Sequence, residues 1–435
     1  MKIKILWILF CLPLISLGQQ TSVISSADAI RIALENNLNI KIVNSNLDIA
    51  EIQNNWANAG KLPTIQANIG NTEALSNLNQ VLSNGTIIKR NGVTNNIVNA
   101  SLNAIWRVYN GNRVTATKER FDELEKIGTL QVEQQMQQIT YEVLSTYYNI
   151  VRLNQQVKAF QSNILLSKER LNIAQARFDV GNAAKTDMLQ SKIDLNEQLI
   201  SLQEIQRQIS SNKIALNTLM KNSAEFIFEV VDSSFKIPTI DYKNILAKLD
   251  TQNISILLAE RQLAVIAKDR IIINAQKLPI VSLNSTTNYS RTIATGGLFL
   301  TNMTYGPNIG VSVSIPIFNT TAVKTQLKIN AIQFRQQELQ KELIQTQLKQ
   351  DILVAYQDYQ NAISVADIEK KNIVIAEENN FISTERFKKL QSNLIELRQA
   401  QSSLIQAQDR YINALFKAKM AANAIQYIIG ELGSE

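Results

Sequence analysis

The sequence has 435 residues, of which 44 are Lys or Arg, 37 are Asp or Glu and none is histidine. Without histidine the chain lacks the commonest general base and metal ligand, and with Cys11 as its one cysteine it forms no internal disulfide, so we expect neither an enzyme nor a cofactor. The excess of basic residues is dispersed along the chain, which indicates a solvated surface and no nucleic-acid partner.

Residues 1–18 have the pattern of a signal peptide. Lys2 and Lys4 precede an apolar run, and Ser16-Leu17-Gly18 offers small residues for cleavage. The run is too short for a membrane-spanning helix. Lipid attachment at Cys11 is an alternative, but Phe10 stands before it, where a small residue is expected. We therefore expect an exported protein that is cleaved without lipidation.

The chain contains an internal repeat. Lys61-Leu62-Pro63 recurs as Lys277-Leu278-Pro279, an offset of 216 residues (61 to 277). Further on, Arg177-Phe178 recurs as Arg386-Phe387 at an offset of 209, and this offset holds for about 110 residues. The expected organisation is repeat 1 over 26–221, a linker over 222–241 and repeat 2 over 242–430.

Each repeat begins with a helical stretch, over 27–60 in the first, and continues into strands. Apolar residues then alternate with Asn, Ser, Thr and Gly, a pattern typical of strands with one apolar and one polar face. Between Leu278 and Val323 the one charged residue is Arg291. An uncharged polar face favours a membrane β-barrel over the alternative, a small soluble β-sandwich. The expected strands are about 64–76, 96–109, 280–292 and 305–318.

Long helical hairpins follow the strands, over 111–221 and 320–430. In the first, apolar residues recur every seven positions from Met136 to Phe178, as in a coiled coil. Some 70 helical residues make a rod of roughly 100 Å. Gly181 interrupts the pattern, as a glycine does at the end of a helix, so the second helix returns antiparallel.

Four strands per chain cannot close a barrel, and lipid tolerates no open sheet edge. Three copies give about 12 strands, enough for a barrel with a lumen, whereas about 8 leave an interior filled by side chains. The sequence therefore predicts a homotrimer that pools its strands, with the helices as staves of a second, helical barrel.

Several segments resemble the TolC, or outer membrane efflux protein, family over nearly the whole mature chain. The segment from Asn308 to Asn319 carries the resemblance, as do Arg177-Phe178-Asp179-Val180-Gly181 with Asp187-Met188-Leu189, and Arg386-Phe387 with Glu396-Leu397. The resemblance implies a homotrimer with a 12-stranded barrel in outer-membrane lipid and a helical barrel in the periplasm. It also implies a periplasmic adaptor and an inner-membrane transporter as partners, in drug efflux or type I secretion.

The resemblance further implies where the functional residues lie. The adaptor would contact the hairpin tips, which are Val180, Gly181, Asn182, Leu390 and Gln391. The constriction that gates the channel would be lined by Asp187, Glu396 and Gln399.

The sequence departs from the family pattern at both places. Leu390-Gln391 replaces the usual Val-Gly of the second tip, and Gln399 replaces an expected acid. For Asp187 and Glu396 the alternative role is stabilisation of a helix N-terminus by an acidic side chain in the first turn.

The competing function is a periplasmic coiled-coil adaptor. An adaptor accounts for the export signal and the hairpins, but for neither the duplication nor the uncharged strands.

Overall fold

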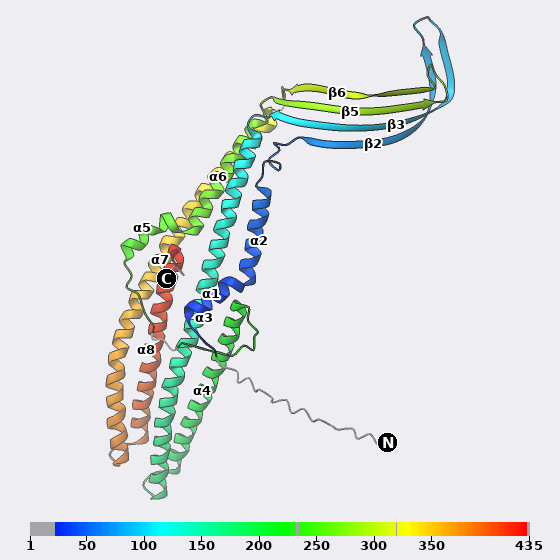
Figure 1. The fold of residues 1–435 in the computed structure, drawn as a ribbon. Helices are drawn as coiled ribbons and strands as arrows, with labels where there is room; N and C mark the ends of the chain where they lie inside the picture. Colours follow the sequence, from blue (N-terminus) through cyan, green and yellow to red (C-terminus); the bar gives the residue numbers. More distant parts are fainter. Residues whose placement is uncertain (1–21, 232–234, 319, 433–435) are drawn as a thin grey trace, which may run out of the picture.

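The computed structural model describes residues 22–231, 235–318 and 320–432. The expected signal peptide, residues 1–18, lies outside the described residues. The described chain is an elongated molecule with a β-sheet at one end and helical hairpins that extend away from it (Figure 1). In the described ranges, no helix carries an apolar stretch of the length that a bilayer crossing requires.

The larger sheet has four antiparallel strands in the order β2-β3-β5-β6. Each half of the chain therefore contributes one pair of neighbouring strands, β2 with β3 and β5 with β6. The strands are β2 (Thr64–Val81), β3 (Ile87–Tyr109), β5 (Ile280–Ala294) and β6 (Thr301–Ser314). β2 and β6 are its two edges.

The strand boundaries differ from the expected ones. β2 and β3 extend beyond 64–76 and 96–109, because backbone pairing continues past the segment in which apolar and polar residues alternate. The expected strand over 305–318 starts earlier and ends at Ser314, just before Pro316, which has no N–H to donate.

Two long hairpins form the rest of the molecule. The first comprises α3 (Arg113–Asp179) and α4 (Lys185–Met220), and the second comprises α7 (Thr320–Lys388) and α8 (Leu394–Ile429). Toward the tips α3 contacts both α4 and α8, which gives the lateral order α4-α3-α8-α7. α4 and α7 are therefore the outer helices of the chain.

Between the sheet and the middle of the molecule, other helices replace α4 and α8. α2 (Leu38–Gln53) lies against α3, and α6 (Ile254–Ala275) lies between α3 and α7 (Figure 1). The helix expected over 27–60 is thus wrong as a single element. It breaks at Asn37, whose buried carboxamide accepts the N–H of Asn39 and donates to the carbonyl of Leu219 at 3.0 Å.

Short elements surround the middle of the hairpins. β1 (Ser22–Ile24) pairs in parallel with β4 (Phe228–Val230), and α1 (Ser26–Asn36) and α5 (Tyr242–Gln252) lie nearby. The segment 222–241, expected as a plain linker, therefore contains a strand. Its partner lies some 200 residues away, so no local pattern indicates the pairing.

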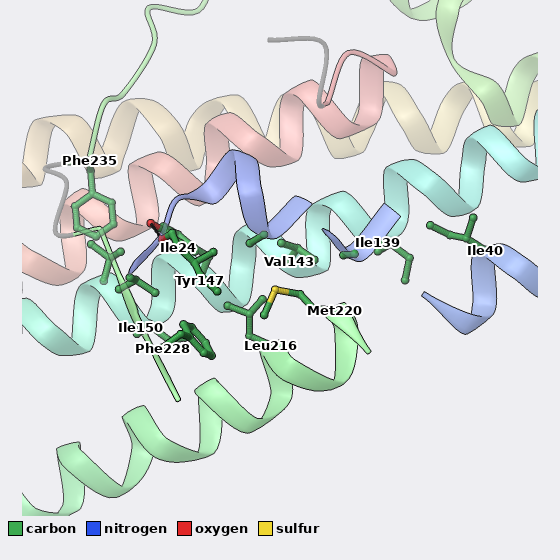
Figure 2. Close-up of a cluster of buried hydrophobic side chains, with 14 residues drawn as sticks. Ile24, Ile40, Ile139, Val143, Tyr147, Ile150, Leu216, Met220, Phe228 and Phe235 are labelled. Carbon is green, nitrogen blue, oxygen red and sulfur yellow. Dashed lines mark hydrogen bonds between the residues drawn. The ribbon is translucent and has the colours of Figure 1, made fainter. Parts of the chain in front are cut away.

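Two clusters of the hydrophobic core occupy corresponding places in the two halves of the chain, and a third, of Phe387, Leu394 and Leu397, lies beside the turn of the second hairpin. Figure 2 shows the first, in which Val143, Leu216 and Met220 join α3 to the end of α4. In the second, Ile352, Ile425 and Ile429 stand 209 residues later and join α7 to α8. Equivalent apolar positions thus join the two helices of each hairpin.

Candidate functional site

The first hairpin turns at Val180, Gly181 and Asn182. Gly181 has φ +77°, and the N–H of Asn182 donates to the carbonyl of Arg177 at 2.8 Å while that of Gly181 donates to Phe178. This is the bonding of a Schellman motif, which satisfies the last carbonyls of a helix and favours glycine. Val180 projects into solvent. The turn therefore presents a small exposed apolar surface at the end of the molecule.

The second hairpin makes the same turn without a glycine. Leu390 has φ +63°, and the N–H of Gln391 donates to the carbonyl of Arg386 at 2.9 Å. A left-handed backbone costs an L-residue about 1–2 kcal/mol. Leu390 and Gln391 therefore form the turn of the second hairpin, but Leu390 occupies a conformation that glycine would adopt more easily.

The two tips lie at the end of the molecule far from the sheet (Figure 1). The guanidinium of Arg177 stacks over the ring of Phe387 at 4.4 Å, and Lys388 pairs with Glu169 at 2.7 Å. Side chains of the first hairpin thus contact side chains of the second next to the turns.

Glu396, expected at the constriction, lies in the first turn of α8. Its carboxylate accepts from Arg386 at 2.6 Å, and its backbone N–H donates to the side chain of Asn393 at 2.9 Å. An arginine of its own hairpin therefore balances its charge.

Asp187 lies in the corresponding first turn of α4. Gln399 lines a cavity of about 430 Å³ together with Arg170, Asp194 and Arg398. The structure thus brings Gln399 next to a charged cluster that the sequence reasoning missed.

That cluster is centred on Asp194 of α4, which is buried between three helices. Arg170 of α3 donates to its carboxylate at 2.8 Å, and Arg398 of α8 makes a two-point contact at 2.7 and 3.0 Å. Gln190 donates at 2.9 Å, and Gln401 accepts from Arg170 at 2.6 Å.

Burial lowers the pKa of the Arg170 guanidinium, whereas the negative charge of Asp194 opposes that shift. Arg170 is 5% exposed, so this is an internal ion network and not a surface pair. The signal in the sequence is weak: Asn163, Ser167 and Arg170 are buried polar residues of α3, but the exposed Lys168 and the half-buried Glu169 stand beside them.

The sheet has two chemically different faces. Ile309, 74% exposed, pairs with Ser285 on the face that also carries Ile65, Leu102 and Leu283. The opposite face carries amides and hydroxyls, and some of them bond across strands. It includes Gln66, Asn68, Ser101, Asn103, Asn284, Thr286, Asn288, Ser290, Thr304, Asn308 and Ser312.

Within the described ranges no group of His, Cys, Asp and Glu side chains could hold a metal ion. The sheet with one apolar and one neutral polar face, and the hairpins about 100 Å long, define a class of protein: an outer-membrane channel with a helical extension.

Comparison with known proteins gives the family. The family profile described as "Outer membrane efflux protein" matches residues 29–221 and 246–431, and the chain belongs to this family. Its place is accordingly the outer membrane. The profile matches in two segments that correspond to the two halves of the chain.

Individual relatives are distant in sequence. The chain is 21% identical over 306 residues to the outer membrane efflux protein BepC of Brucella suis biovar 1 (strain 1330). That alignment covers 69% of this chain and 64% of BepC, just under two thirds of the relative's length.

Solved structures share the fold. The outer-membrane channel OprN superposes with a TM-score of 0.78 at 16% identity, over 94% of this chain and 91% of OprN. The open-state outer membrane channel MtrE of Neisseria gonorrhoeae gives a TM-score of 0.72 at 19% identity, over 94% of this chain and 89% of MtrE. These relatives are channels and not enzymes.

Proposed function

We propose that the protein is the passive exit duct of a tripartite efflux pump or type I secretion system. Three copies would form a 12-stranded barrel in the outer membrane and a helical barrel that extends into the periplasm. The observation that carries this proposal is the four-stranded sheet with two open edges, an apolar outer face and a neutral polar face. Such a sheet is stable in lipid only when its edges are paired.

The outer helices support the same assembly. α7 carries a row of exposed apolar residues along its length, among them Ile332, Leu339, Ile368, Ile375 and Ile382. Ile332 and Leu339 stand seven residues apart, as do Ile368 and Ile375 and then Ile382, which is the spacing of a coiled-coil seam without a partner. Because α4 and α7 are the outer helices of each chain, α7 of one copy would pack against α4 of the next, just as β6 would pair with β2.

The mass of the purified protein tests the assembly. In detergent, light scattering should report three copies of the mature chain, and the protein should require detergent for extraction. A monodisperse monomer, or protein recovered in quantity without detergent, would contradict the duct. Recovery without detergent would also favour the competing periplasmic adaptor.

The hairpin tips would be the contacts for a periplasmic adaptor, which in turn joins an inner-membrane transporter. Val180, Gly181 and Asn182 form one contact and Leu390 and Gln391 the other. Gly181→Asp places a charge on the exposed turn and should abolish co-purification of the adaptor while the trimer mass stays unchanged.

Gly85→Asp is the matched control for the tip, since Gly85 is another glycine of positive φ with open space around it, in the turn between β2 and β3. If both variants retain the adaptor equally, the first tip is not the contact.

The constriction would be lined by Glu396 and Gln399 of the second hairpin and Asp187 of the first. Because Arg386 balances Glu396, we expect Glu396→Gln to leave an extra positive charge per copy and to shift the reversal potential in a salt gradient toward anions. Arg386→Gln should shift it the other way.

Glu204→Gln is the control for the constriction, because Glu204 belongs to an exposed pair with Arg207 on the side of α4. Identical reversal potentials for all variants would show that Glu396 does not line the permeation path.

A further inference from the structure

The junction between the sheet and the helices carries an aromatic cluster on the apolar face. At the end of β3, Trp106 pairs with Leu283 and Arg107 with Ser282, but the next pair is Tyr109 with Val281. The irregularity at Val108 therefore places Trp106 and Tyr109 on the same face of the sheet, although their positions differ by three, which in a regular strand would put them on opposite faces. Both side chains are more than 40% exposed.

A lysine is held in the middle of this cluster. The indole N–H of Trp106 donates to the backbone carbonyl of Lys61 at 2.9 Å, and the Lys61 ammonium lies 4.3 Å from the ring centre of Trp56. Among the described residues no carboxylate forms an ion pair with Lys61. Trp106 thus holds the backbone of Lys61 and Trp56 holds its ammonium, whose charge remains available.

The same residues line a cavity of about 250 Å³ whose charged members are all basic. Lys61 and Arg107 contribute, and no Asp or Glu lines it. Its floor includes the start of α3, whose first turn carries no acid. The side chain of Asn112 makes no capping bond, and that of Asn110 accepts the N–H of Val114 at 3.4 Å. The first backbone N–H groups of a helix add further positive potential. The cavity is thus suited to an anionic group.

The position of the cavity selects the kind of anion. It lies where the apolar face of the sheet ends and the helices begin, which is the level of lipid headgroups if the sheet spans the membrane. Tryptophan and tyrosine concentrate at this level, and basic pockets there bind anionic headgroups. A soluble partner would not need the adjoining apolar face.

We propose that Trp56, Lys61 and Trp106 form a binding site for the phosphate of an anionic glycerophospholipid in the periplasmic leaflet of the outer membrane. The proposal goes beyond the duct and rests on its placement in the membrane. One acyl chain would lie along the apolar face next to Trp106, and the Lys61 ammonium would contact the phosphate.

The second half of the chain provides an internal control. At the offsets that relate the halves, Ile272, Lys277 and Ile315 stand where the first half has Trp56, Lys61 and Trp106. The lysine is retained and both tryptophans are absent. A site that depends on Trp56 and Trp106 should therefore exist at Lys61 and not at Lys277.

Native mass spectrometry of the full-length assembly in detergent tests the site, with phosphatidylglycerol and phosphatidylcholine added in separate titrations. Wild type should retain phosphatidylglycerol preferentially. Lys61→Gln should weaken that binding about fivefold or more, the effect of one basic residue at an anionic lipid surface. Trp106→Ile, which introduces the residue of the second half, should weaken it as well, whereas Lys277→Gln should not.

The same spectra report the number of subunits, which separates loss of the lipid site from loss of the assembly and of the proposed duct. Equal retention of both lipids by wild type would overturn the proposal. So would equal weakening by Lys61→Gln and Lys277→Gln, because the effect would then be one of general surface charge.

Discussion

Leu390 takes a left-handed backbone conformation at a turn that its counterpart, Gly181, makes with a glycine. A Cβ costs about 1–2 kcal/mol in this conformation, partly offset by the greater entropy that glycine loses on folding. Leu390→Gly should therefore stabilise the protein by about 1 kcal/mol, and Gly181→Leu should destabilise it by a similar amount. Denaturant midpoints in detergent measure both. An unchanged midpoint for Leu390→Gly would mean that contacts of the leucine compensate for its backbone.

Ionisation of the buried Tyr147 hydroxyl should lower the free energy of unfolding at high pH. Burial raises the pKa of its hydroxyl to about 12, and the hydroxyl donates to the carbonyl of Ile24 at 3.1 Å. Because the unfolded chain releases this proton near pH 10, the stabilisation is complete below about pH 10 and is lost as the pH rises toward 12. The loss should be about 2–3 kcal/mol.

Tyr147→Phe is the variant that isolates this effect. It should cost about 1 kcal/mol at neutral pH for the lost hydrogen bond and make the decline between pH 10 and 12 less steep. The carbonyl of Ile24 keeps the N–H of Val231 as a donor at 3.2 Å, so the change leaves no unpaired acceptor. Thermal unfolding of both proteins at a series of pH values measures this loss of stability. An identical decline between pH 10 and 12 in both would rule out Tyr147 as its cause.

At the scale of elements, Asp194 joins α3, α4 and α8 near the tips. Asp194→Asn would leave the buried guanidinium of Arg170 without its anion, at a cost of about 3–5 kcal/mol, and would also remove the partner of the half-exposed Arg398. We expect faster hydrogen exchange in the first turns of α8, with exchange in the sheet unchanged.

Glu204→Gln is again the comparison for Asp194→Asn, since an exposed pair within one helix contributes little to stability. Equal exchange in α8 for Asp194→Asn and wild type would show that apolar packing alone holds the hairpins together.

At the scale of the whole molecule, assembly in the membrane depends on which face of the sheet contacts lipid. Ile309 and Asn308 are neighbours in β6 at nearly the same depth but on opposite faces. Ile309→Arg would place a charge in lipid, at about 2–4 kcal/mol near the bilayer centre, whereas Asn308→Arg would place it in the lumen. The amount of assembled trimer in outer-membrane fractions should fall for the first variant only. Equal amounts would mean that the apolar face does not contact lipid.

The sequence by itself was sufficient for the family, the outer-membrane location, the alternating strands and the two long hairpins. The strands and hairpins depend on local periodicity, which repeats within one element: period two in a strand and seven in a coiled coil. The family and the location follow from the resemblance of short segments such as Asn308 to Asn319. The turn at Gly181 is also local, because glycine adopts its positive φ without steric cost.

Only the tertiary structure decided which distant residues meet. The pairing of β1 with β4, the break of the first helix at Asn37 and the ion network of Asp194 each depend on a partner far along the chain. Even the balance of Glu396 by Arg386 depends on how the hairpin turns. A local pattern shows whether a side chain is polar or apolar. The residue that lies opposite it is set by the packing of the helices, because that residue can be far away along the chain.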